Sequence, residues 1–162
     1  MLDLRPAVAE DAARLHALRE AAARWLQARG IRQWQPGEVE MATFGTQIAA
    51  GEWFLDRRGG AVRAALRFLW SDTPFRGERP DDTGYVHGLV IDRGQAGEGL
   101  GGQLLGGAED RTRQAGRRFL RLDCAADNER LRGHYRERGF VERGRREFRD
   151  WGPVVLLEKP LI

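Results

Sequence analysis

The alternation of apolar and polar positions divides the chain into amphipathic helices and short strands. Apolar residues at helical spacing predict a first helix from about Ala9 to Ala28 and a second from about Val39 to Ala50. Apolar runs bounded by turn residues predict strands at Leu2–Arg5, Glu52–Asp56, Ala61–Trp70, Tyr85–Ile91, Phe119–Asp123, Val141–Phe148 and Val154–Glu158. We therefore expect one α/β (α+β) domain over residues 1–162, in which helices cover the faces of a mixed sheet.

A glycine-rich loop separates the strand at Tyr85–Ile91 from the next helix. Backbone N–H groups at the start of a helix lack partners within the helix, and the helix dipole adds partial positive charge there, so a diphosphate fits such a loop. Glycine permits that approach because a side chain would block it. The glycines exceed what a tight turn requires and stand at Gly94, Gly97, Gly99, Gly101 and Gly102.

Two nucleotide-binding motifs compete for this loop. The spacing Gly97-x-Gly99-x-x-Gly102 satisfies a dinucleotide-binding pattern, and Asp123 ends the next strand, where a ribose-binding acid would stand. In that fold, however, the first glycine follows the strand almost directly, whereas Asp92 to Ala96 intervene here. The phosphate loop of nucleoside triphosphatases fails because no Lys-Ser or Lys-Thr follows the glycines. A dinucleotide-dependent oxidoreductase is therefore kept as a weaker interpretation.

The segment beyond the helix resembles a known family. The strand Phe119-Leu120-Arg121-Leu122-Asp123 leads to Asn128, and Tyr135 then begins a Tyr-x-x-x-Gly-Phe ending at Phe140. These features follow the glycine loop in the same order as in the GNAT superfamily of acyl-CoA-dependent N-acyltransferases, which the chain resembles closely over its central third. One departure is Ala96, which stands where the family usually has Gln or Arg. Because backbone N–H groups supply most of the grip on phosphate, this departure should weaken the site more than abolish it.

The resemblance implies a fold and a cofactor site. The family has a mixed, mostly antiparallel sheet with helices on both faces, and its acyl-CoA site lies in the central strand-helix-strand unit. The strands ending near Ile91 and Asp123 would splay, and the pantetheine arm of acetyl-CoA would lie between them along the backbone of Leu89, Val90 and Ile91. Asn128 would bond the pantetheine region, and no metal is required. The diphosphate would lie on the loop of Ala96, Gly97, Glu98, Gly99, Leu100, Gly101 and Gly102.

The chemistry of such a family needs an oxyanion site and a proton donor. Backbone N–H groups near Leu89 and Val90 can polarise the thioester carbonyl, and such donors typically contribute about 3 kcal/mol each. Tyr135 matches the position that in many members protonates the coenzyme A thiolate, and a phenol with a pKa of about 10 is protonated at neutral pH. A core position is the alternative for Tyr135, because it follows Leu131 by one helical turn.

The base and the acceptor site also have candidates. His87 alternates with Leu89 and Ile91 on one strand face and resembles the site where some members place a base, whereas burial against the backbone is its alternative. Asp123 occupies a position where certain peptide-modifying members use an acid. Trp34 lies between the first two helices, so it is a candidate substrate wall or a core residue. The same two roles are open for all five tryptophans, Trp25, Trp34, Trp53, Trp70 and Trp151.

Composition narrows the range of functions. A chain of 162 residues with 41% hydrophobic residues suits one domain with a sizeable core. The formal charge is only +3, its arginines are interleaved with acids, and no DNA- or RNA-binding module is recognised, so we expect no nucleic acid partner. Cys124 is the sole cysteine, and no membrane span, signal peptide or metal-ligand spacing is found. We therefore expect a cytoplasmic protein without a metal.

The leading interpretation is an N-acetyltransferase that moves an acetyl group from acetyl-CoA to a primary amine of a small molecule or peptide, by direct attack in a ternary complex. A non-catalytic acyl-CoA-binding sensor with the same fold is the alternative from another class. Both monomer and homodimer are open, because the edge strands after Val141 could pair with a second copy.

Overall fold

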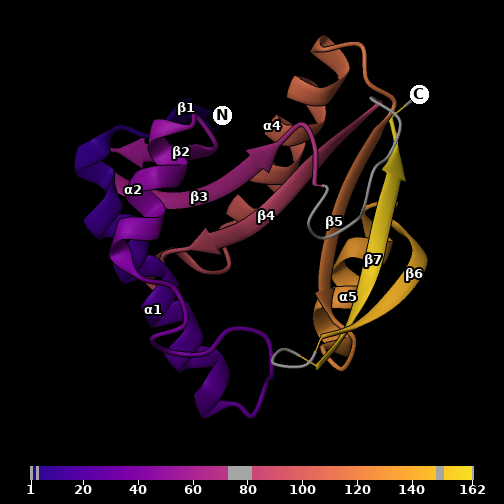
Figure 1. Cartoon of the computed structure of the whole chain (residues 1–162), viewed down its shortest axis with the longest axis horizontal. Helices are drawn as coiled ribbons and strands as arrows, with labels where there is room; N and C mark the ends of the chain where they lie inside the picture. Colours follow the sequence, from indigo (N-terminus) through magenta and orange to yellow (C-terminus); the bar gives the residue numbers. More distant parts are fainter. Residues whose placement is uncertain (1, 3, 73–81, 149–151, 162) are drawn as a thin grey trace.

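The described residues, 2, 4–72, 82–148 and 152–161, form a seven-stranded sheet with helices on both faces (Figure 1). In this computed structural model the strand order is β1-β2-β3-β4-β5-β7-β6. The strands are β1 (Leu4–Pro6), β2 (Trp53–Arg58), β3 (Ala61–Leu69), β4 (Thr83–Ile91), β5 (Phe119–Ala125), β6 (Val141–Phe148) and β7 (Gly152–Pro160). Among these described strands β4 and β5 pair in parallel and all other neighbours pair antiparallel, which confirms the expected mixed sheet.

Two apolar cores hold the helices on opposite faces of this sheet. The helices are α1 (Ala12–Ala28), α2 (Met41–Ala49), α4 (Leu100–Gln114) and α5 (Glu129–Glu137), with the short 3₁₀ turns η1 (Ala9–Asp11) and η2 (Arg93–Gln95). One core joins α1 and α2 to β2, β3 and β4 through residues such as Leu15 and Phe44 (Figure 1). The other joins α4 and α5 to β3, β4, β5 and β7 through residues such as Leu104 and Leu120. Because both faces of the central strands are buried, their register is strongly specified.

Most predicted elements are confirmed, with boundaries shifted by a few residues. The turn between β2 and β3 consists of Gly59 and Gly60, whose positive φ angles of 58° and 82° suit a tight two-residue hairpin. The helix expected from the glycine loop begins only at Leu100. The expectation for Trp151 lies outside the described residues.

β4 and β5 are paired at one end and separate at the other. The register pairs Thr83–Tyr85 with Phe119–Arg121, and the two strands then diverge (Figure 1). This confirms the splay that the family resemblance implied. In the described part of the chain no strand pairs with this edge of β4 beyond Tyr85.

A β-bulge at Gly88 changes which side chains of β4 share a face. Val90 pairs with Ala65 and His87 pairs with Arg67, so two residues of β4 oppose one residue of β3. Leu89 and Ile91 consequently pack with Val86 on the core beneath α4, whereas His87, as the neighbour of Val86, lies on the opposite face. The prediction that His87 alternates with Leu89 and Ile91 on one face is therefore wrong, because it assumed regular alternation through the bulge.

Candidate active site

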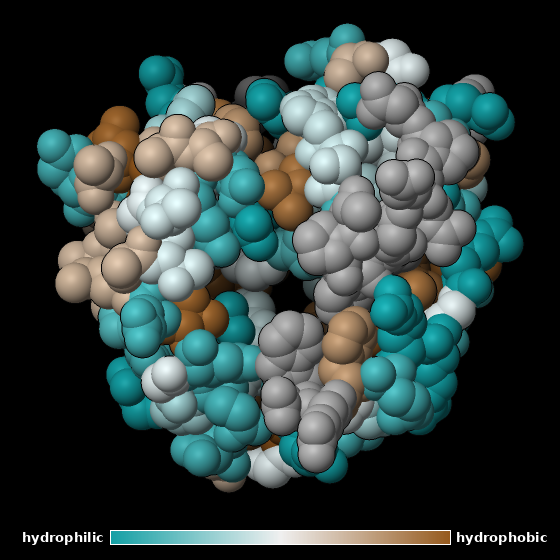
Figure 2. All heavy atoms as spheres, viewed as in Figure 1, coloured by the Kyte–Doolittle hydropathy of each residue, from teal (hydrophilic) through white to brown (hydrophobic). Residues whose placement is uncertain are grey.

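A cavity of about 1010 Å³ opens where β4 and β5 separate. Figure 2 shows the molecule hollowed near its centre, between the half that carries α1 and α2 and the half that carries β6 and β7. A volume of about 300–1,000 Å³ is usual for a small-molecule or cofactor site. The cavity brings together several of the predicted site residues, namely Trp34, His87, Leu89, Asp123 and Tyr135.

His87 lies between two carboxylates in this cavity. Its Nε2 lies 3.1 Å from Oδ2 of Asp72, and its Nδ1 lies 3.6 Å from Oδ2 of Asp123. Asp72 follows β3, His87 belongs to β4 and Asp123 belongs to β5, so three elements meet here. The side chain of Asp72 is 7% exposed, against 21% for His87 and 19% for Asp123. The cavity thus joins two predicted candidates and adds Asp72, which the sequence did not indicate.

Tyr135 lines the cavity from α5 and is packed in the core at the same time. Its ring meets that of Phe140 edge to face, with centroids 5.6 Å apart. Burial raises the pKa of Tyr135, and the neighbouring Cys124 and Asp123 add to the rise. The phenol therefore keeps its proton at neutral pH, and core packing fixes the ring beside the cavity.

Cys124 is buried beside these residues and has the character of a packed apolar side chain. Burial, together with the adjacent Asp123, raises the pKa of its thiol to about 12. A thiol with such a pKa is a poor nucleophile because the thiolate is the reactive form. Cys124 is therefore a small buried side chain of the core.

Aromatic side chains line the part of the cavity next to α1 and α2. Trp34 lies in the loop between these helices, and the guanidinium of Arg19 stacks 4.0 Å from its ring centroid. Trp53 and Trp70 also line the cavity. Trp25 lies outside this lining and stacks with two arginines instead. Of the described tryptophans, Trp34, Trp53 and Trp70 therefore line the cavity, and Trp25 does not.

A second charged pair lies beside His87 on the same face of the sheet. Arg67 is the partner of His87 in the β3–β4 register, and its Nε donates to Oε2 of Glu52 at 2.8 Å. Sequence reasoning missed this pair, although the two arginines inside the otherwise apolar strand Ala61–Leu69, Arg63 and Arg67, were an available signal. Asp72 carried no comparable signal, because it stands in an irregular stretch after the strand.

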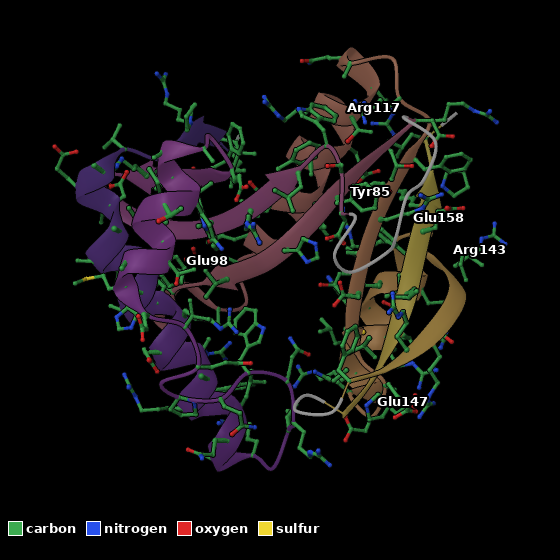
Figure 3. All side chains as sticks on the ribbon, viewed as in Figure 1. Tyr85, Glu98, Arg117, Arg143, Glu147 and Glu158 are labelled. Carbon is green, nitrogen blue, oxygen red and sulfur yellow. The ribbon has the colours of Figure 1, made fainter. Side chains whose placement is uncertain are left out.

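The predicted diphosphate loop lies at the start of α4, outside the lining of the cavity. Gly97 and Gly99 have positive φ angles of 89° and 76°, and a Cβ at either would meet nothing within 4 Å. Glycine is thus required here by backbone conformation rather than by crowding within the protein. Glu98 is exposed and lies near the tip of β4 (Figure 3).

The N–H groups of this loop suit an anion. The amide of Gln103 donates to the carbonyl of Gly99 at 3.2 Å, so the amides of the preceding turn have no acceptor within the helix. Asp92 organises the approach to the loop, because its Oδ1 accepts from the N–H of Gly94 at 2.9 Å and its Oδ2 accepts from Arg14 at 2.5 Å. The donor set fits the diphosphate of an acyl-CoA.

Asn128 caps α5 and also ties that helix to the loop between α1 and α2. Its Oδ1 accepts from the N–H of Leu131 at 3.2 Å, and its Nδ2 donates to Oε1 of Gln33 at 3.1 Å. Gln33 lines the cavity. The predicted contact between Asn128 and a pantetheine arm stays a prediction, and both polar atoms of the amide already have partners within the protein.

Two features are absent from the described residues. No group of three or more His, Cys, Asp or Glu side chains there is arranged to hold a metal ion. Within the same residues no helix has both the length and the apolar character needed to cross a membrane.

Comparisons with known proteins agree with this geometry. The model of the Acetyltransferase (GNAT) family matches residues 15–140. The chain is 31% identical over 143 residues to the uncharacterized N-acetyltransferase YesJ of Bacillus subtilis (strain 168), which covers 83% of this chain and 79% of that protein.

Solved structures show the same fold. A GNAT family acetyltransferase from Listeria monocytogenes 4b F2365 aligns with a TM-score of 0.76 and 25% identity, over 98% of this chain and 94% of that one. The putative acetyltransferase yncA from Salmonella typhimurium, solved with its cofactor acetyl-CoA, aligns with a TM-score of 0.73 and 18% identity, over 100% of this chain and 95% of that one. The protein belongs to the GNAT family of acetyltransferases and is an acetyl-CoA-dependent acyltransferase.

Proposed function

We propose that this protein transfers the acetyl group of acetyl-CoA to a primary amine of a small molecule or a peptide, by direct attack of the amine within a ternary complex. The observation that carries the proposal is the meeting of His87, Asp123 and Tyr135 in one cavity at the point where β4 and β5 separate. A proton acceptor and a proton donor then flank a single space, as direct transfer requires.

The splayed strands and the glycine loop would hold the cofactor. Acetyl-CoA supplies the activated acetyl group. The open edge of β4 at Leu89, Val90 and Ile91 would bind the pantetheine arm through backbone groups, and the amides of the loop from Ala96 to Gly102 would bind the diphosphate. The Salmonella relative of the same fold contains acetyl-CoA, which supports this assignment.

The chain's own groups would handle charge and protons. The backbone N–H groups of Leu89 and Val90, beside the bulge, would donate to the acetyl carbonyl oxygen. Tyr135 would donate its proton to the departing sulfur, since its hydroxyl stays protonated in the buried site. His87, supported by Asp123, would take the proton of the amine.

The acceptor would enter from the side of α1 and α2. Trp34 and Trp53 line that part of the cavity, and the Arg19–Glu38 and Arg67–Glu52 pairs give it polar walls. A primary amine with an apolar or aromatic body is matched by such a surface. Cytoplasmic location and the choice between monomer and homodimer stay predictions.

The experiment measures thiol release from acetyl-CoA with a panel of primary amines, and mass spectrometry identifies the acetylated product. Wild-type protein is expected to turn over at least one amine, and Tyr135→Phe is expected to lower kcat by about 10² or more without changing the affinity for coenzyme A. Tyr85→Phe is the matched control, because Tyr85 lies outside the cavity lining and its hydroxyl accepts from Arg121 at 3.2 Å (Figure 3).

Two outcomes would contradict the proposal. If coenzyme A binds tightly but no amine releases thiol, the protein is an acyl-CoA-binding sensor. If Tyr135→Phe turns over at the wild-type rate, Tyr135 is a core residue and another group donates the proton.

A further inference from the structure

Asp72 makes the shorter of two contacts to the ring of His87. Its Oδ2 lies 3.1 Å from Nε2, which is a hydrogen-bond distance. On the other side of the ring, Nδ1 lies 3.6 Å from Oδ2 of Asp123, which is longer than an N···O hydrogen bond. The Asp72 carboxylate is also the more buried of the two, at 7% against 19% exposed. The two carboxylates are therefore not equivalent partners of the ring.

This difference selects one tautomer of His87. A neutral imidazole has one N–H and one lone pair, and an ionised carboxylate only accepts hydrogen bonds. The nitrogen at hydrogen-bond distance from Asp72 must then carry the hydrogen, which leaves the lone pair on Nδ1. Nδ1 is the nitrogen that faces Asp123 of β5, across the opening between the splayed strands.

We propose that Asp72 is a positioning residue for acetyl transfer: its carboxylate holds His87 in the Nε2–H tautomer, so that Nδ1 is the atom that receives the proton of the acceptor amine. The inference rests on the proposed function and adds a residue to it. In this step one N–H bond of the acceptor ammonium breaks, its electron pair stays on the amine nitrogen, and a new N–H bond forms at Nδ1. The imidazolium then donates to Asp72 from Nε2 and faces Asp123 from Nδ1.

The charges around the ring favour this step. Asp72, which follows β3, and Asp123 from β5 both face the ring with carboxylates. Arg67 of β3 pairs with His87 in the sheet register, but its Nε donates to Glu52, whose carboxylate offsets the positive charge of the guanidinium. Tyr135 from α5 lines the same cavity in its neutral form, because burial raises its pKa. A positive charge that forms on the ring is therefore stabilised by two nearby negative charges.

The test reads the tautomer of His87 directly and then perturbs it. The ¹⁵N chemical shifts of the two ring nitrogens are measured at a pH at which the ring is neutral, and the Nε2–H form is expected in the wild type. In Asp72→Asn the side-chain amide can donate to Nε2, so the Nδ1–H form is expected to gain population. For an amine that the wild type acetylates, Asp72→Asn should lower kcat/KM by about 10²-fold and leave KM for acetyl-CoA unchanged.

Two further variants separate positioning from general effects. Asp72→Glu keeps a carboxylate and should keep the Nε2–H form. Glu52→Gln removes a carboxylate from the same cavity that is bonded to Arg67 rather than to His87, so it should leave the tautomer unchanged. Retention of the wild-type pH profile of kcat/KM in Asp72→Asn would speak against the proposal, because a positioning residue acts on the protonation of the base.

The outcomes decide between the proposal and its failure. An Nδ1–H tautomer in the wild type overturns it, and so does a tautomer that Asp72→Asn leaves unaltered. If Asp72→Asn does not fold, the tautomer of His87 in the wild type and in Asp72→Glu still tests the proposal. If the wild type acetylates no amine, the proposed function fails, whereas the chemical shifts still decide whether Asp72 positions the ring.

Discussion

Replacing Gly88 by alanine tests whether the bulge of β4 shapes the cavity. Gly88 has a positive φ of 58°, and a Cβ there would lie 2.9 Å from Cη2 of Trp53. The left-handed conformation costs a non-glycine residue about 1–2 kcal/mol. Making room beside the indole ring overpacks a buried site, which costs about 1–3 kcal/mol. We therefore expect the free energy of unfolding to fall by about 2–5 kcal/mol.

Urea unfolding measures this change, and Gly116→Ala is the control. Gly116 also has a positive φ, of 73°, but a Cβ there would meet nothing within 4 Å, so it carries the backbone cost alone. In a Trp53→Phe background the cost of Gly88→Ala should drop to that of Gly116→Ala, since Cη2 is gone. Equal costs for Gly88→Ala and Gly116→Ala in the wild-type background would refute the close approach of Gly88 and Trp53.

The same variant should also damage the proposed chemistry. A shift of the bulge changes the direction of the backbone N–H groups of Leu89 and Val90, which would face the acetyl carbonyl oxygen. Thiol release, measured at a temperature at which Gly88→Ala is folded, should fall by about 10-fold or more. Wild-type turnover in a folded Gly88→Ala would show that the bulge does not orient these donors.

Other predictions concern the glycine loop. Gly101→Asp places a carboxylate in the first turn of α4, where it would repel the diphosphate, and should weaken acetyl-CoA binding in calorimetry by about 10-fold or more. Gly106→Asp is the control, because it lies further along the same helix with open space around it, and it should bind acetyl-CoA like the wild type. Asp92→Asn should be less stable than the wild type at neutral pH, because the hydrogen bond from the Gly94 N–H lowers the pKa of Asp92 in the folded state. That difference should be constant above about pH 5 and shrink as the pH falls through the lowered folded-state pKa, in urea titrations; a difference that grows on acidification would contradict the assignment.

Features that depend on local pattern could be predicted from the sequence. The glycine loop before α4 needs residues that accept positive φ, and Gly97 and Gly99 both adopt it. Asn128 is a favourable N-cap residue, and it caps α5. Tyr135 and Phe140 share a helix-and-turn pattern that packs them together. In each case neighbours along the chain supply the physical reason for the structure.

Features that depend on distant segments could not be predicted in this way. The bulge at Gly88 is defined by pairing with β3, so alternation along β4 alone placed His87 on the wrong face. Asp72 follows β3 and His87 belongs to β4, so their contact depends on how the sheet brings these two segments together. The partner of Asn128, Gln33, lies far away in the sequence. Side-chain partners of this kind follow from tertiary packing and leave no mark on hydrophobic periodicity.

The central claim is that the opening between β4 and β5, together with the start of α4, binds the acyl-CoA. Its most direct test is a titration of ¹⁵N-labelled protein with coenzyme A, in which the backbone amide signals are assigned and followed. The account predicts the largest shifts at Leu89, Val90 and Ile91 and along the loop from Gly97 to Gly102. Shifts confined to other surfaces, or the same shifts with NAD and none with coenzyme A, would contradict it.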